Sequence, residues 1–255
     1  MNNLIRAEFY KLERNPAFWA LVFSVTGLST LLHFLILTEW WYMSGTPFYQ
    51  AGLVELNGLS PFITPLFFNL LVGTLAAYSI ATEFSRNGVI RNQIMSGNQR
   101  NHIFLSKFTV FSLGSFFIVI VIPMVTALIL ATFFGNEHLL TVSQALFIAR
   151  SYGLFFLHFL CFTGMVLFIA ILSEDSGRTI LFTLLLSVVM FAIEKLVTTP
   201  FIKFLYEQTF FYQMSNAFNH SLSSGEIAKS IVVGIVSLLI ILGCGMFMFK
   251  KKEFH

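Results

Sequence analysis

Long apolar runs separated by short polar segments dominate the sequence. A helix needs about 20 apolar residues to cross the hydrocarbon core of a bilayer, and six runs are long enough to be candidates. They are Pro16 to Leu37, Phe62 to Ala81, Ile103 to Phe134, Leu146 to Leu172, Thr179 to Ile193 with an extension to Thr199, and Ile227 to Phe249. The third run contains Pro123, which lacks a backbone donor, so we expect a kink there. The pattern predicts an all-α membrane protein with six transmembrane helices.

The segment from Asn2 to Arg14 has a different pattern. Ile5, Phe9 and Leu12 recur at helical spacing, and charged side chains occupy much of the remaining surface. This predicts an amphipathic helix that lies in the plane of the membrane surface. A passive anchor and an active part in transmitting motion are both compatible with the pattern.

Composition supports a membrane location for the whole chain. Of the 255 residues, 56% are hydrophobic and 11% are charged, whereas soluble proteins carry about 25% charged residues. Residues 1–255 are therefore predicted to form a single membrane domain. The two cysteines and the net charge of +3 exclude a disulfide scaffold and give no basis for nucleic-acid binding.

The basic residues are distributed unevenly between the two sides of the predicted bundle. Eleven lie on the side of the termini: Arg6, Lys11, Arg14, Arg86, Arg91, Arg100, Lys107, Arg178, Lys250, Lys251 and Lys252. Four lie on the other side: Arg150, Lys195, Lys203 and Lys229. By the positive-inside rule, both termini are predicted to be cytoplasmic.

The connection from Ala81 to Lys107 is longer than two adjacent spans require. Ile90 and Ile94 lie four residues apart, on one face of a helix, and Gly97 can adopt the left-handed conformation that closes a helix. We expect a short helix across the cytoplasmic end of the bundle. A basic loop that contacts anionic lipid headgroups is the alternative.

A pattern of charged, glycine and aliphatic residues covers the same connection. It consists of Glu83, then Gly88, Ile90 and Arg91, then Arg100, Ile103 and Lys107. This pattern resembles the first cytoplasmic connection of type-2 ABC exporter permeases, and the opening LIRAEFYKLERNPAFW resembles the N-terminal elbow helix of that family. Val89 stands where the family usually has threonine. The stretch from Ser96 to Arg100 lacks the proline that often precedes the arginine.

The resemblance implies a coupling helix that fits into a groove of a cytoplasmic ABC ATPase subunit. Closure of the ATPases around nucleotide would then tilt the attached spans. The residues assigned to this coupling are Glu83, Arg86, Gly88, Ile90, Arg91 and Arg100. The resemblance also implies a second permease copy or a related permease. No phosphate-loop motif of the form G-x(4)-G-K-[ST] occurs in the chain, so ATP and Mg are expected on the partner, with no cofactor or catalytic residue here.

The connection from Glu194 to Lys229 combines aromatic and charged residues. This composition suits a helical hairpin at the outer interface, which the resemblance also implies between the fifth and sixth spans. An irregular aromatic loop at the interface is the alternative.

Other kinds of chemistry find little support. The six histidines form no H-E-x-x-H motif, no G-x-S-x-G motif is present, and no metal site is predicted. His158, inside the fourth span, is predicted to form a hydrogen bond between packed helices. No span has a carboxylate near its midpoint, which argues against a carrier coupled to protons or sodium.

These observations predict the permease subunit of an ATP-driven exporter in a bacterial plasma membrane. The chain is similar overall to permeases for bacitracin or lantibiotic export and immunity and for phenol-soluble modulins, which implies a hydrophobic or amphipathic substrate. Phe-rich spans offer apolar walls for such a substrate. A non-transporting membrane enzyme or scaffold and an ion-coupled carrier are the alternatives.

Overall fold

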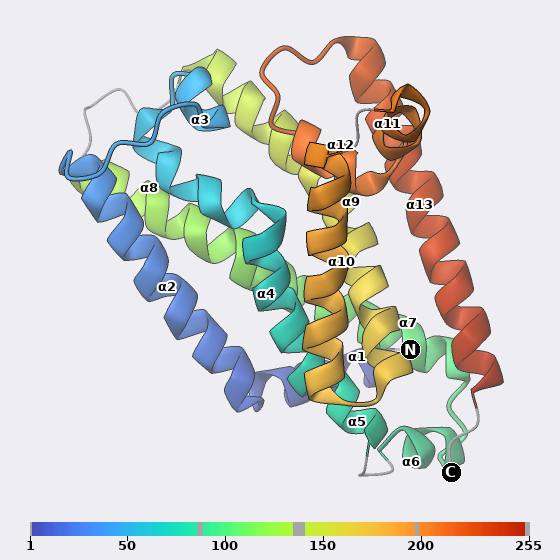
Figure 1. Ribbon diagram of the computed structural model, residues 1–255. Coiled ribbons are helices and arrows are strands. Elements are labelled where there is room, and N and C mark those ends of the chain that lie inside the picture. Colours follow the sequence, from blue (N-terminus) through green and yellow to red (C-terminus); the bar gives the residue numbers. More distant parts are fainter. Residues whose placement is uncertain (1, 86–88, 135–140, 197–198, 253–255) are drawn as a thin grey trace.

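The computed structural model describes residues 2–85, 89–134, 141–196 and 199–252. Within these ranges every regular element is a helix (Figure 1). Six helical stretches are long and apolar enough to cross a bilayer. In chain order they are Pro16–Leu37 (α2), Pro65–Phe84, Arg100–Phe134, Val142–Ser173 (α9), Ser176–Leu196 (α10) and Ser224–Lys251 (α13). The prediction of an all-α protein with six membrane spans is confirmed.

The third span has a π-helical turn just before Pro123, the residue at which the sequence predicted a kink. It consists of α7 (Arg100–Phe116), a π-helical turn η3 (Phe117–Val121) and α8 (Ile122–Phe134). Pro123 has no amide proton to donate to the carbonyl four residues earlier, on Val119, and that carbonyl lies in the π turn. The wider turn allows the helix to continue past the proline.

The second span starts three residues later than the apolar run. Thr64 is extended, with φ −79° and ψ 126°, as is usual for the residue before a proline. The helix α4 (Pro65–Ala76) starts after it and continues through a second π turn, η2 (Ala77–Ala81), into α5 (Thr82–Ser85). Glu83, near the end of this span, therefore lies in a helix.

The segment between the first two spans folds back into the bundle, which the apolar pattern did not predict. It contains α3 (Pro47–Gln50) and a 3-10 helix, η1 (Val54–Ile63), which packs against α2 and α8. Asn57 is fully buried; its amide oxygen accepts a hydrogen bond from Thr46 at 2.5 Å, and its amide nitrogen donates one to the Met43 carbonyl at 3.1 Å.

Small residues allow α4 and α10 to pack closely. A Cβ atom added at Gly73 would lie 2.6 Å from Oγ1 of Thr183, and the side-chain amide of Asn69 donates to the Thr183 carbonyl at 2.5 Å. Close approach through small residues is typical of helix packing in membranes. Nε2 of His158 in α9 forms a hydrogen bond of 2.8 Å with Oγ of Ser230 in α13, which confirms the predicted packing role of His158.

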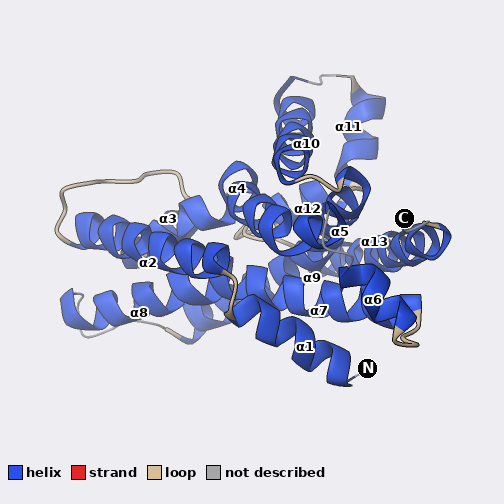
Figure 2. Cartoon of the chain, turned by 90° about the horizontal axis from the view of Figure 1, so that it is seen from below, coloured by secondary structure: helices blue, strands red, loops and turns tan. Residues whose placement is uncertain are grey.

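The bundle has two distinct ends (Figure 1). One, which we call the α6 end, carries α1 (Asn2–Glu13), α5, α6 (Val89–Met95) and both chain termini. The other, the α11 end, carries α3 and the predicted hairpin, formed by α11 (Pro200–Glu207) and α12 (Phe210–Asn216). Figure 2 shows α9 between α7 and α12, with α10 and α11 on one side of the bundle and α1 on the other.

Candidate functional site

The amphipathic helix α1 packs against the bundle at the α6 end. Leu12 fits against Gly114 of α7, where an added Cβ would lie 2.7 Å from the leucine Cδ2. After α1, Asn15 caps α2 by accepting a hydrogen bond from the Ala17 amide at 2.9 Å, and its own amide donates to the Tyr78 carbonyl at 3.2 Å. These contacts connect α1 to the second and third spans.

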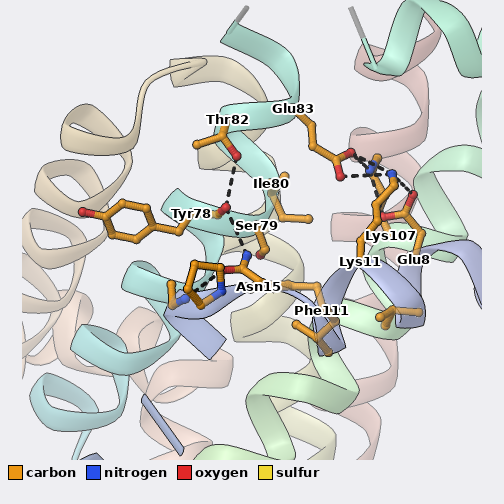
Figure 3. A pocket seen from close by; sticks show the side chains of 14 residues that line it. Glu8, Lys11, Asn15, Tyr78, Ser79, Ile80, Thr82, Glu83, Lys107 and Phe111 are labelled. Carbon is orange, nitrogen blue, oxygen red and sulfur yellow. Dashed lines mark hydrogen bonds and ion pairs between the residues drawn. The ribbon is translucent and has the colours of Figure 1, made fainter. Parts of the chain in front are cut away.

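Four charged side chains, two of them from α1, meet where α1 packs against the bundle. This charge cluster consists of Glu8, Lys11, Glu83 and Lys107 (Figure 3). Nζ of Lys11 lies 2.7 Å from Glu8 and 3.0 Å from Glu83. Nζ of Lys107 lies 3.0 Å from Glu8 and also contacts Glu83. Each carboxylate therefore binds both ammonium groups, and the cluster joins α1, α5 and α7.

The charge cluster is mostly shielded from solvent. The side chain of Lys107 is 0% exposed, Glu8 is 6%, Glu83 is 13% and Lys11 is 33% exposed. Charges are costly to bury unless they are paired and hydrogen-bonded. Two positive and two negative groups in mutual contact meet this requirement with no net charge.

The pKa values of two groups in α1 reflect this arrangement. Burial by itself would raise the pKa of Glu8, but the attraction of Lys107 and Lys11 outweighs it, and the pKa lies below its ordinary value. Burial would lower the pKa of Lys11, but Glu83 and Glu8 raise it above its ordinary value. Both residues are therefore charged at neutral pH.

The short helix α6 is attached to the charge cluster. Nε2 of Gln93 donates a hydrogen bond of 3.0 Å to Oε1 of Glu8, and Ile90 is buried. The helix closes at Gly97, whose φ of +84° is the left-handed conformation predicted from the sequence. The structure thus confirms a short helix at this place.

The other face of α6 is open to solvent. Its exposed residues are Arg91, Asn92 and Met95, followed by Ser96. Met95 is 73% exposed, which is high for a long apolar side chain. A protein partner can bind this face through the cation of Arg91, the amide of Asn92 and the flexible thioether of Met95.

A pocket of about 340 Å³ lies beside the charge cluster (Figure 3). Its wall includes Asn15, Tyr78 and Ile80, so it borders the π turn η2. Among the described residues, no group of three or more metal-binding side chains converges here or elsewhere. The chemistry of the site is that of ion pairing and hydrogen bonding between helices.

A model of the family described as "ABC-2 family transporter protein" matches residues 4–193. The chain belongs to the ABC-2 transporter family. The match spans about three quarters of the sequence and includes most of α1, the charge cluster and α6. No curated protein and no solved structure matches the chain. Membership of the ABC-2 family indicates a membrane-embedded permease subunit and implies a separate ATPase subunit as its partner.

The residues assigned to ATPase coupling occupy different environments in this ABC-2 protein. Glu83 lies in the charge cluster, Ile90 faces the bundle and Arg91 faces solvent. Arg86 and Gly88 fall outside the described residues. The coupling role of all these positions stays a prediction.

Arg100 contacts the last span instead of lying on the exposed face of α6. Its Nη1 donates hydrogen bonds of 2.7 Å to the carbonyls of Lys250 and Lys252. Lys250 lies in the last turn of α13 and Lys252 caps that helix, and a cation at this end also interacts favourably with the helix dipole. Arg100 thus connects the start of α7 to the end of α13.

Sequence reasoning missed Glu8, Lys11 and Gln93 as parts of the site. The available signal was the position of Glu8, which on a helix borders the apolar stripe of Ile5 and Leu12. A carboxylate beside the buried face requires a cationic partner, and Lys11 at i+3 is one such partner.

Proposed function

We propose that the chain is the permease subunit of an ABC exporter, with ATP hydrolysed by a separate subunit. It moves a hydrophobic or amphipathic substrate out of a bacterial cell, across the plasma membrane. An antimicrobial or cytolytic peptide, such as a phenol-soluble modulin, is the proposed substrate. Two permease copies, or this chain and a related permease, share the pathway.

The attachment of α6 to the charge cluster is the observation that carries the proposal. Force on the exposed face of α6 reaches Glu8 through Gln93. From Glu8 it passes to Lys107 at the start of the third span, and from there to Glu83 at the end of the second. Movement of an ATPase subunit against α6 is therefore transmitted to two spans and α1 together.

The distribution of charge supports a cytoplasmic α6 end. Eleven of the 15 basic residues lie on that side in the sequence, which is the bias of cytoplasmic connections. The exposed face of α6 is then accessible to a cytoplasmic ATPase. Transport follows the outward direction, towards the α11 end.

The test is to purify the tagged chain from its native membrane in mild detergent, identify its partners by mass spectrometry and assay ATPase activity. We expect a phosphate-loop ATPase at near-equal stoichiometry, which is lost with Arg91→Glu. Arg178→Glu is the matched control, because Arg178 is an exposed basic residue at the same end but outside α6. Recovery of the intact chain without any ATPase would contradict the proposal.

A further inference from the structure

A groove with apolar walls lies at the α11 end, over the start of α4. Two pockets, of about 780 and 170 Å³, have four wall residues in common: Thr64, Pro65, Leu66 and Ser215. They therefore adjoin each other along these residues, and we call the two together the α4 groove. Its walls come from η1, α4, α10 and the hairpin helices, including Phe67, Leu70, Met190, Phe191 and Phe211.

Two buried hydroxyl groups line the α4 groove without hydrogen-bond partners among the described residues. They are Oγ of Ser60, on a residue that is 9% exposed, and Oγ of Ser187, on a residue that is 1% exposed. A buried polar group without a partner costs about 1–3 kcal/mol. Both oxygens lie beneath the groove surface, so a ligand contacts them only after the surrounding side chains shift.

Glu194 is the only charged side chain among the described residues that line the groove. Its Oε2 accepts a hydrogen bond of 3.2 Å from the Tyr206 hydroxyl. Burial and the nearby Glu194 raise the pKa of Tyr206, so the phenol remains a donor. Oε1 of Glu194 pairs with Lys195 at 2.8 Å, but the lysine side chain is 58% exposed. Such an exposed pair contributes little and can be replaced by another cation.

The groove offers less to an anion. The N-terminus of α4 lies in its wall, and a helix N-terminus can bind negative groups. Here the first residue is Pro65, which has no amide proton, and the amides of Phe67 and Phe68 are already bonded to the Thr64 carbonyl. The carboxylate of Glu194 is therefore the dominant charge.

We propose that the α4 groove binds a cationic amphipath, with its apolar body along α4 and α10 and its cationic group on Glu194. Binding to the groove does not require the proposed export function. The inference rests on that function only where it identifies the bound cationic amphipath as the exported molecule. The site lies on the side from which an exported substrate departs.

Binding is tested on the isolated permease in nanodiscs, without any ATPase. The probes are a dansyl-undecyl ammonium and its carboxylate analogue, dansyl-undecanoate, and empty nanodiscs give the background. We expect saturable binding that is stronger for the ammonium probe. Glu194→Gln should weaken ammonium binding about tenfold, as expected for loss of a charge-assisted hydrogen bond. Glu207→Gln, on α11 but outside the groove wall, should leave it unchanged.

A second variant tests the groove independently of the charge. Leu66→Trp, at a position in the wall of both pockets, should reduce binding of both probes. Leu239→Trp on the exposed face of α13 is its matched control. Equal binding of the two probes, or ammonium binding unaffected by both Glu194→Gln and Leu66→Trp, would overturn the inference. Since no ATPase is present, such a result would leave the proposed export function to its own test.

Discussion

Lys107 is the most deeply buried residue of the charge cluster. Its side chain is completely buried, and it lies between Glu8 and Glu83. The ammonium group offsets the repulsion between the two carboxylates, which Lys11 alone would compensate less well because a third of its side chain is exposed. The two lysines of the cluster are therefore not equivalent, although both contact the same carboxylates.

Replacement of Lys107 should destabilise the protein more than replacement of Lys11. Lys107→Met leaves buried carboxylates undercompensated, and breaking a buried pair in this way costs about 3–5 kcal/mol. Lys11→Met should cost less, because its partially exposed pairs are weakened by solvent. Thermal unfolding of the two purified variants in the same detergent measures the order. Equal losses would show that burial does not decide the contribution of each lysine.

The contribution of Glu8 to stability should depend on pH on the acid side. The pKa of Glu8 is lowered from 4.5 in the folded state, so its contribution is present above pH 4.5 and is lost as the pH falls through the folded pKa. The pKa of Lys11 is raised from 10.5, so its contribution is lost only above that value. Unfolding temperatures of the wild type and Glu8→Gln should differ at pH 7 and converge below pH 4.5. A constant difference would contradict the pairing of Glu8.

At the scale of elements, the contact between α4 and α10 depends on the absence of a side chain at Gly73. Thr183 occupies the space beside this glycine, and Asn69 one turn away bonds to the Thr183 backbone. The fifth span makes most of its contacts along this narrow strip and with α9, and the rest of its surface carries exposed apolar side chains.

Gly73→Ala should lower the unfolding temperature, because the added methyl group would push α10 away from α4. Gly27→Ala is the matched control in α2, since nothing lies within 4 Å of the added Cβ and alanine favours a helix over glycine by about 1 kcal/mol. We expect the control to be neutral or stabilising. If both variants behave alike in thermal unfolding, the close contact at Gly73 does not limit packing.

The spans could be predicted from the sequence because a bilayer demands long apolar helices, and the first span was predicted to the residue. Structure that depends on contacts between distant segments could not be predicted in this way. The 3-10 helix η1 is buried because it packs against α2 and α8, which are not adjacent to each other in the sequence. The partners of Glu8 are Lys11 nearby and Gln93 and Lys107, which lie 85 and 99 residues away, so no local pattern identified them together.

For the whole molecule, the charge asymmetry between the two ends predicts its orientation. In a background without the native cysteines, Ser96→Cys at the α6 end should react with a membrane-impermeant maleimide only after cells are permeabilised. Glu207→Cys at the α11 end should react in intact cells. Gel shift or fluorescence of the labelled protein measures both. The opposite pattern would reverse the orientation and with it the proposed direction of transport.

The charge cluster also has a consequence for the order in which the chain is synthesised. Glu8 and Lys11 leave the ribosome about a hundred residues before Lys107, and chains fold from the N-terminus as they emerge. Glu8 of α1 can pair with the fully buried Lys107 only after the third span has entered the membrane. The cluster therefore forms only once the first three spans have been inserted, and α1 stays at the membrane surface until then.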